Sequence, residues 1–223
     1  MPNLFRNRRE AGRQLAAKLS KYAHQPNVSV LALPRGGVPV AYEVARALDA
    51  PMDVFLVRKL CVPQQPELAM GAIASGGARV MNDDILQMLH IPNYVIEEIA
   101  ARELQELERR ERTYRQGRPS LDVRGRTVIL VDDGLATGAS MRAAVKALRQ
   151  LKPARIVVAV PTASAETCDT FRDEVDEIVC AQTPEPFIAV GAWYDDFSQT
   201  TDDEVRELLS REVSERMGVK TKA

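Results

Sequence analysis

Two adjacent carboxylates near the middle of the chain lie between an apolar run and a loop of small residues, an arrangement typical of a ligand-binding site. Asp132 and Asp133 follow an apolar run, residues 128–131, and precede a loop of small and hydroxyl-bearing residues at 136–140. A helical pattern opens at Met141. Backbone N–H groups at a helix start lack partners and carry partial positive charge, so the loop predicts a phosphate site. Carboxylates repel phosphate, so Asp132 and Asp133 are expected to bind another group beside it. They could accept hydrogen bonds from hydroxyls or hold a hydrated cation. A ribose 5-phosphate with free 2- and 3-hydroxyls supplies both groups.

A second strand–loop–helix pattern precedes this one. Residues 28–33 form an apolar run, the loop at 33–39 carries Arg35, Gly36 and Gly37, and a helical pattern covers residues 38–48. A further strand is predicted at 52–57, and later ones at 155–160 and 175–181, joined by a helix around 165–171. Repetition of this unit indicates a parallel sheet with helices on both faces. The two loops then lie at the same sheet edge, where open α/β sheets bind ligands.

The run from Val128 to Ser140 resembles the signature of the type I phosphoribosyltransferases. The resemblance implies that Asp132 and Asp133 hold the ribose hydroxyls of phosphoribosyl pyrophosphate (PRPP), and bind Mg²⁺ indirectly, through PRPP or water. It also implies a 5-phosphate loop made of Ala136, Thr137, Gly138, Ala139 and Ser140. Gly134 departs from the family, which usually has a branched apolar residue there, but this change removes no ligand group.

The same resemblance extends to the basic residues and to a lid. Arg35, Gly36 and Gly37 look like the family's pyrophosphate loop, and Arg58 and Lys59, which close the predicted strand at 52–57, are similar to its basic pair. Arg35 and Lys59 would then stabilise the departing pyrophosphate. Residues 60–82 resemble the mobile lid that excludes water, with a hairpin between 70–74 and 78–81. Glu67 is a candidate acid or base toward the incoming nucleophile.

Each of these features also has a plainer interpretation. Asp, Gly, Thr and Ser suit a surface turn with a helix cap, and the glycine loop could be an ordinary turn between strand and helix. Arg58 and Lys59 could be a charged strand end, with no indication of which side chain faces inward, and Glu67 could be merely solvated.

The acceptor side is indicated by aromatic residues near the C-terminus. Phe187, Trp193 and Tyr194 lie in a stretch that resembles the purine-contacting segment of hypoxanthine-guanine phosphoribosyltransferases, and aromatic faces stack on planar bases. Packing against the predicted final helix at 202–217 is the alternative role. Ala136 replaces an aspartate of those enzymes, and residues 135–138 are closer to adenine phosphoribosyltransferases, so a purine or related base is expected without naming which.

Composition excludes several other classes of protein. The 223 residues are 45% hydrophobic and 27% charged with a net charge of −1, which gives no global attraction to nucleic acid or to a membrane. No apolar run approaches a membrane span, and basic residues 1–10 lack the apolar core of a secretory signal. Three cysteines without metal-ligand spacing suit a reducing cytoplasm, with Cys180 as a small core residue, and two separated histidines form no metal cluster.

Together these patterns predict one α/β domain over residues 1–223, with about five parallel strands flanked by helices. Its core spans about 28–181, its lid about 60–82, and an acceptor-side segment and helix about 184–217. The charged helical stretch at 101–115 is expected to be exposed, and a homodimer is expected. The expected activity is Mg²⁺-dependent, cytoplasmic transfer of a phosphoribosyl group from PRPP to a small nitrogenous acceptor. The whole arrangement resembles most the uncharacterised bacterial members of the family. The alternative is a PRPP-sensing regulator that binds nucleic acid; a dinucleotide-binding oxidoreductase is disfavoured because neither leading strand precedes a Gly-x-Gly-x-x-Gly.

Overall fold

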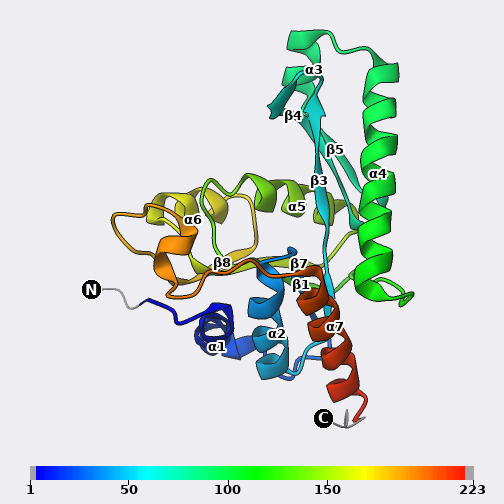
Figure 1. Cartoon of the computed structure of the whole chain (residues 1–223). Coiled ribbons are helices and arrows are strands. Elements are labelled where there is room, and N and C mark those ends of the chain that lie inside the picture. Colours follow the sequence, from blue (N-terminus) through cyan, green and yellow to red (C-terminus); the bar gives the residue numbers. More distant parts are fainter. Residues whose placement is uncertain (1–3, 219–223) are drawn as a thin grey trace.

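A five-stranded parallel sheet forms the body of the molecule in the computed structural model, which describes residues 4–218 (Figure 1). The strands lie in the order β2-β1-β6-β7-β8, and each adjacent pair is parallel. Their bounds are β1 (Val28–Ala32), β2 (Met52–Val54), β6 (Thr127–Val131), β7 (Arg155–Thr162) and β8 (Glu177–Gln182). The predicted fold class and the five parallel strands are therefore confirmed.

Helices cover both faces of this sheet. On one face lie α1 (Arg8–Lys18), α2 (Gly37–Leu48) and α7 (Asp202–Arg216), and on the other lie α5 (Ala139–Gln150) and α6 (Ala165–Arg172) (Figure 1). Alternate residues of β6 join the two cores: Ile129 and Val131 pack on the first face, Val128 and Leu130 on the second. Because β6 is buried on both faces, its residues form an almost continuous apolar run, without the polar alternation of a strand that faces water.

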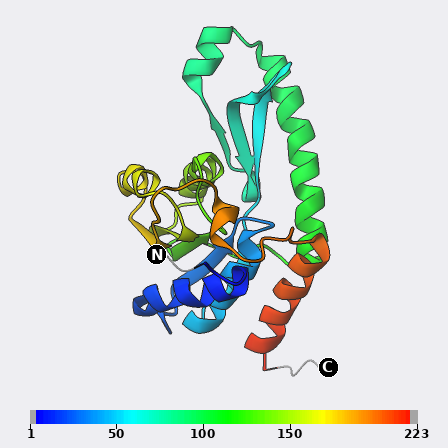
Figure 2. The same cartoon turned by 60° about the vertical axis from the view of Figure 1, so that its left-hand side comes forward.

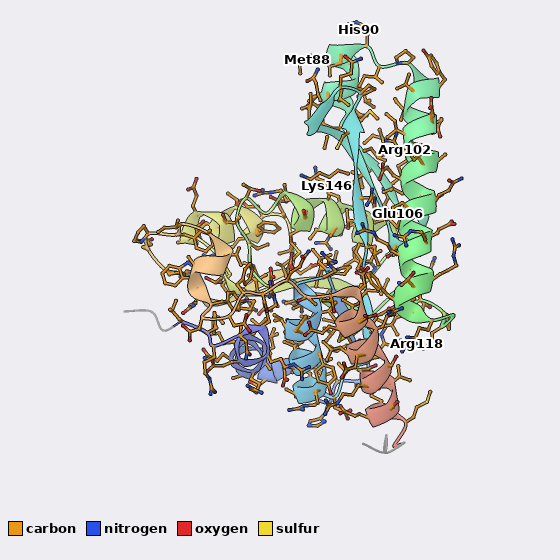
Figure 3. The ribbon with its side chains drawn as sticks, in the orientation of Figure 1. Met88, His90, Arg102, Glu106, Arg118 and Lys146 are labelled. Carbon is orange, nitrogen blue, oxygen red and sulfur yellow. A yellow bond between two sulfur atoms is a disulfide. The ribbon has the colours of Figure 1, made fainter. Side chains whose placement is uncertain are left out.

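A smaller unit, here called the hood, projects from the body in both views (Figures 1 and 2). It contains an antiparallel sheet, β3 (Val57–Val62), β4 (Gln65–Ala74) and β5 (Arg79–Met81), with α3 (Asp83–Leu89) and α4 (Asn93–Arg115). The predicted hairpin is present, since β4 pairs with β5 around the short helix η2 (Ser75–Gly77). Met88 and His90 lie at its far end (Figure 3). The other short 3-10 helices are η1 (Ser20–Tyr22) and η3 (Val190–Trp193).

The predicted strand at 52–57 is wrong in its second half. The parallel strand β2 ends at Val54, and the chain enters the hood sheet at Val57. The break is stabilised by Ser75, whose hydroxyl accepts from the Leu56 amide at 2.9 Å and whose own amide donates to the Leu56 carbonyl at 2.9 Å. Phe55 and Leu56 are buried at this junction, so the apolar run in the sequence continues through it. Arg58 and Lys59 therefore belong to the hood, and do not close a strand of the parallel sheet.

A buried ion pair anchors the hood to the body. The Arg115 Nε at the end of α4 donates to both carboxylate oxygens of Asp53 on β2, at 3.0 Å each, and its Nη2 donates to the Val54 carbonyl at 3.0 Å. Opposite charges also pair one turn apart along α4, as with Arg115 Nη1 and Glu111 Oε1 at 2.8 Å. Arg115 was expected on an exposed face, but only 9% of its side chain is exposed, because this helix end docks on β2.

The start of the described chain lies alongside the segment that follows β8. Phe5 forms a parallel bridge with Tyr194; its amide donates to the Trp193 carbonyl at 2.9 Å, and its carbonyl accepts from the Asp195 amide at 2.8 Å. The Asp196 amide donates to the Arg6 carbonyl at 3.0 Å. The segment before α1 thus runs alongside the segment that was expected to contact the acceptor.

The cysteines differ from the sequence interpretation. Cys168 of α6 and Cys180 of β8 form a disulfide, whereas Cys180 was expected to be a plain core residue, and Cys61 is free. The pairing could not be predicted because the two positions become neighbours only when α6 packs on β8. Among residues 4–218, no helix is both long enough and apolar enough to cross a membrane.

Candidate active site

The two predicted loops meet at the carboxyl edge of the parallel sheet. β1 and β6 are neighbours in register, with Ala32 beside Val131, so the glycine loop and the acidic pair leave the sheet side by side. Contact is tight: a Cβ on Gly37 would lie 2.7 Å from the Val131 carbonyl oxygen and 2.9 Å from the Asp132 Cα. A Cβ on Gly36 would overlap the Asp133 carboxylate. Glycine at both positions therefore allows the first loop to lie directly against the acids.

The acidic pair is half-buried and partly neutralised. The Asp132 Oδ1 accepts from the Asp133 amide at 2.8 Å, and the Asp133 Oδ2 accepts from the Arg8 Nε at 2.8 Å. Burial raises the pKa of Asp132 well above its usual range, and the neighbouring Asp133 charge raises it further. Burial also raises the pKa of Asp133, against the opposing effect of Arg8. Such a pair favours ligands that donate hydrogen bonds or bring positive charge.

The predicted phosphate loop, residues 136–140, lies at the protein surface. The Leu135 amide donates to the Thr162 carbonyl at 2.9 Å, which attaches the start of the loop to β7. Gly138 has a left-handed φ of 73° and is the N-cap of α5, and a Cβ there would lie 2.5 Å from the Phe171 Cε2. Ala136, Thr137, Ala139 and Ser140 are exposed. The first-turn amides of α5 and the hydroxyls of Thr137 and Ser140 can therefore surround an anion.

Two side chains outside the predicted set shape this loop. The Arg142 Nη1 donates to the Thr137 carbonyl at 2.8 Å, while its Nε donates to Glu174 at 2.7 Å. The Thr167 hydroxyl donates to the Ala136 carbonyl at 3.0 Å. Arg142 and Thr167 thus bind carbonyl oxygens of the loop and do not compete for its amide N–H groups.

The glycine loop connects to α7 through Arg35. The peptide bond between Pro34 and Arg35 is cis, and the Arg35 Nη1 lies 3.5 Å from Asp202 Oδ1 at the start of α7. The same oxygen accepts from the Tyr114 hydroxyl of α4 at 2.8 Å. Burial and that hydrogen bond raise the pKa of Tyr114 to about 12. Arg35 is thus near the site, partly exposed and weakly paired.

The side chains of the predicted basic pair, Arg58 and Lys59, point in different directions. The Arg58 Nε donates to Glu103 of α4 at 2.7 Å, so its side chain faces that helix. Lys59 is exposed, and as the next strand residue it points to the opposite face of the hood sheet. Glu67 lies in β4, but its side chain is outside the part of the chain that the structure describes.

The aromatic candidates have different surroundings. Tyr194 is buried, its hydroxyl donates to the Asp133 carbonyl at 2.6 Å, and its ring packs between Phe5 and Phe197 at centroid distances of 5.4 and 5.0 Å. Tyr194 therefore has a packing role, but against Phe5 and Phe197, whereas the alternative left open was packing against the final helix. Phe187 and Trp193 are only half-buried. The indole Nε1 of Trp193 is buried without a partner in the described part of the chain.

Gly134, the departure from the family pattern, has a structural counterpart. A Cβ at this position would overlap Val190 Cγ1 and would lie 3.1 Å from the Thr162 carbonyl oxygen. Val190 therefore fills the space that a side chain at 134 would use. The turn is therefore tightly packed at Gly134.

The donor set for a metal is small. Among residues 4–218, no group of three or more His, Cys, Asp or Glu side chains could hold a metal ion. Asp132 and Asp133 nevertheless offer hard carboxylate oxygens, which suit Mg²⁺ when a substrate and water complete its coordination. The residues present therefore fit an ion carried largely by its ligand.

Arg8, Arg142 and Asp202 were missed in the sequence. Nothing local distinguishes Arg8 from Arg6 and Arg9, and Arg142 and Asp202 look like ordinary charges in the first turns of helices. Their roles depend on partners far away in the chain, so no spacing pattern could have indicated them.

Comparison with known proteins agrees with this geometry. The family model described as phosphoribosyl transferase domain matches residues 3–192. Two Mycobacterium tuberculosis proteins, of strains CDC 1551 and H37Rv, bear the name "Putative phosphoribosyl transferase"; each is 47% identical over 208 residues, covering 93% of this chain and 47% of the relative. The chain thus spans about half the length of the curated relatives it matches.

A solved structure is also similar over nearly its whole length. A crystal structure of a Thermus thermophilus protein superposes with a TM-score of 0.82 at 45% identity, covering 93% of this chain and 98% of that one. The acidic pair and its phosphate loop lie within the matched residues 3–192. This chain therefore belongs to the phosphoribosyltransferase family.

Proposed function

We propose that the protein transfers the 5-phosphoribosyl group of PRPP to a nitrogenous acceptor, a purine or a related base, and releases pyrophosphate. The observation that carries the proposal is the acidic pair directly after β6, followed through a short loop by the exposed first residues of α5, Ala139 and Ser140. Ribose hydroxyls and a 5-phosphate are held together in PRPP at the short separation that this arrangement requires.

Different residues bind different groups of PRPP. Asp132 and Asp133 accept hydrogen bonds from the 2- and 3-hydroxyls, and residues 136–140 bind the 5-phosphate through amides and hydroxyls. Arg35 and the amide of Gly36 face the pyrophosphate, with Lys59 reaching it from the hood. The Gly37 amide already donates to the Leu33 carbonyl at 3.1 Å, so Gly37 contributes close backbone approach and no donor. Bound Mg²⁺ would supply positive charge beside the pyrophosphate and the ribose oxygens.

The chemical step depends on electrostatic stabilisation. As the C1–O bond breaks, negative charge grows on the pyrophosphate, and Arg35 stabilises it by exchanging its weak, half-exposed contact with Asp202 for the leaving group. The acceptor nitrogen attacks C1 from the other side, beside the half-buried rings of Phe187 and Trp193. Glu67 is proposed as the group that takes the acceptor's proton. Tyr194 supports this wall from the core.

The decisive experiment is binding of Mg·PRPP measured by calorimetry. Asp132→Asn, and the double variant with Asp133→Asn, should weaken binding strongly, because each amide donates where a carboxylate must accept. The matched control is the double Asn variant at Asp83 and Asp84, an exposed adjacent pair at the start of α3. Unchanged PRPP affinity in the site variants would refute the assignment.

A panel of purines, pyrimidines and amines, scored by pyrophosphate release, then identifies the acceptor. Release with one acceptor class supports the transferase. PRPP binding without release across the panel would instead favour a PRPP-sensing regulator, which can be tested by salt-dependent binding to nucleic acid.

A further inference from the structure

One guanidinium joins three parts of the site that are distant in the sequence. The Arg8 Nε donates to Asp133 Oδ2 at 2.8 Å, and its Nη1 donates to the Ser198 carbonyl at 2.6 Å. Its carbon Cζ lies 4.0 Å from the centroid of the Phe197 ring, so the planar group stacks on that ring. Asp133 belongs to the sugar site, whereas Ser198 and Phe197 belong to the segment on the acceptor side.

The glycine loop touches the same group. A Cβ on Gly36 would lie 3.3 Å from the Arg8 Nε, besides overlapping the Asp133 carboxylate. Arg8 thus lies where the glycine loop, the acidic pair and the acceptor-side segment converge. Only 11% of its side chain is exposed, and Asp133 is 16% exposed, so this ion pair is shielded from solvent.

The backbone before Arg8 reinforces the connection. Residues 5 and 6 hydrogen-bond with residues 193–196. The next residues begin α1, whose N-cap Asn7 accepts from the Glu10 amide at 3.0 Å. Arg8 is therefore held from both sides: by a helix that packs on the sheet and by a short bridge to the acceptor-side segment.

We propose that Arg8 is a positioning residue of the transferase site, which aims Asp133 at the sugar and fixes the acceptor-side segment relative to it. The inference rests on the proposed function and extends it to a residue outside the motif. Because Arg8 binds Oδ2 of Asp133, it leaves Oδ1 for a ribose hydroxyl. Through its contacts with Phe197 and Ser198, the same side chain fixes the acidic pair relative to the acceptor-side segment.

Arginine is suited to this task and lysine is not. The guanidinium donates in two directions within one plane while its face covers the Phe197 ring, and an ammonium group provides no such plane. Lysine would keep the charge beside Asp133 but would lose either the Ser198 contact or the stacking. This difference separates a requirement for charge from a requirement for geometry.

The test uses the full chain with three variants: Arg8→Gln, Arg8→Lys and the control Arg6→Gln. Arg6 lies two residues away and its side chain is 75% exposed, so the control makes the same charge change without touching the site. Calorimetry measures Mg·PRPP affinity. Acrylamide quenching of Trp193, the single tryptophan, reports exposure of the acceptor-side segment without any ligand.

Arg8→Gln should weaken Mg·PRPP binding by about 10-fold to 100-fold, the loss typical when a group supporting a ligating residue is removed. It should also increase Trp193 quenching, while Arg6→Gln changes neither. Arg8→Lys should recover part of the affinity but retain the increased quenching, which a general loss of stability would not produce.

Other outcomes overturn the inference. If Arg8→Gln binds Mg·PRPP as tightly as Arg6→Gln, Arg8 does not position the site. Should Arg8→Gln fail to fold, Arg8→Lys decides: affinity and quenching equal to those of the unmodified protein would refute the role of guanidinium geometry. Absence of Mg·PRPP binding in the unmodified protein would instead refute the proposed function, and the inference with it.

Discussion

A methyl group added at Gly134 should destabilise the protein mainly through its overlap with Val190. The backbone at Gly134 does not have a left-handed φ, and the approach to Val190 Cγ1 is much shorter than the 3.1 Å approach to the Thr162 carbonyl oxygen. Overpacking of this kind costs about 1–3 kcal/mol. Val190→Ala alone removes two methyl groups from a half-buried side chain and should cost about 1 kcal/mol.

The two changes should compensate each other. In the double variant, the alanine methyl at 134 enters space that the valine has left, so the double loss should fall short of the summed single losses by about 1–2 kcal/mol. Urea denaturation of the four proteins measures this coupling, and Mg·PRPP affinity reports whether the adjoining acids move. Additive losses, or a neutral Gly134→Ala, would refute the argument that Val190 replaces the missing side chain.

Three further changes test other parts of the structure. Arg115→Ala should lower the free energy of unfolding by about 3–5 kcal/mol, since it leaves a buried aspartate unpaired; urea denaturation checks this. Burial raises the pKa of Glu212 to about 7, against 4.5 unfolded, so the folded state holds this proton more tightly and stability should fall as pH rises from 4.5 to 7. Glu212→Gln should remove this dependence, gaining about 1–3 kcal/mol over the parent at pH 8 in urea denaturation, and an unchanged pH profile would contradict it. Gly138→Ala should weaken Mg·PRPP binding by about 10-fold or more, since its methyl strikes an aromatic ring beside the phosphate loop. Gly117→Ala is the control because it has a similar positive φ but open surroundings, and equal affinities in calorimetry would refute the steric argument.

The parallel sheet and the two loops were predictable because their signals are local. A strand buried on both faces is a continuous apolar run, and it ends where polar or glycine residues begin, so β1 and β6 are found within one residue of their predicted bounds. The chemistry of the motif is also local. Two carboxylates and a run of backbone amides are adjacent in the chain, and no tertiary contact is needed to recognise them.

The junction into the hood was not predictable on the same grounds. Phe55 and Leu56 continue the apolar run of β2, although they are buried in a different environment where the chain changes sheets. The feature that ends the strand is the Ser75 hydroxyl, twenty residues or so downstream, which is polar but has no distinctive spacing. Apolar character indicates burial, but it does not indicate against which sheet a residue is buried.

The relative placement of the site's walls depends on contacts of another kind. Arg8 reaches Asp133 across 125 positions, and Gly134 and Val190 are complementary only as a pair. Each member looks ordinary alone: an arginine among arginines, a glycine in a turn, a valine in a loop. A motif can therefore reveal the groups proposed to bind the sugar phosphate, since those groups are contiguous, while the wall proposed to face the acceptor is built from pairs whose members lie far apart in the chain. On this proposal, acceptor specificity is the property that local patterns describe least well, and residues 5–8 belong to that wall as much as the aromatic segment does.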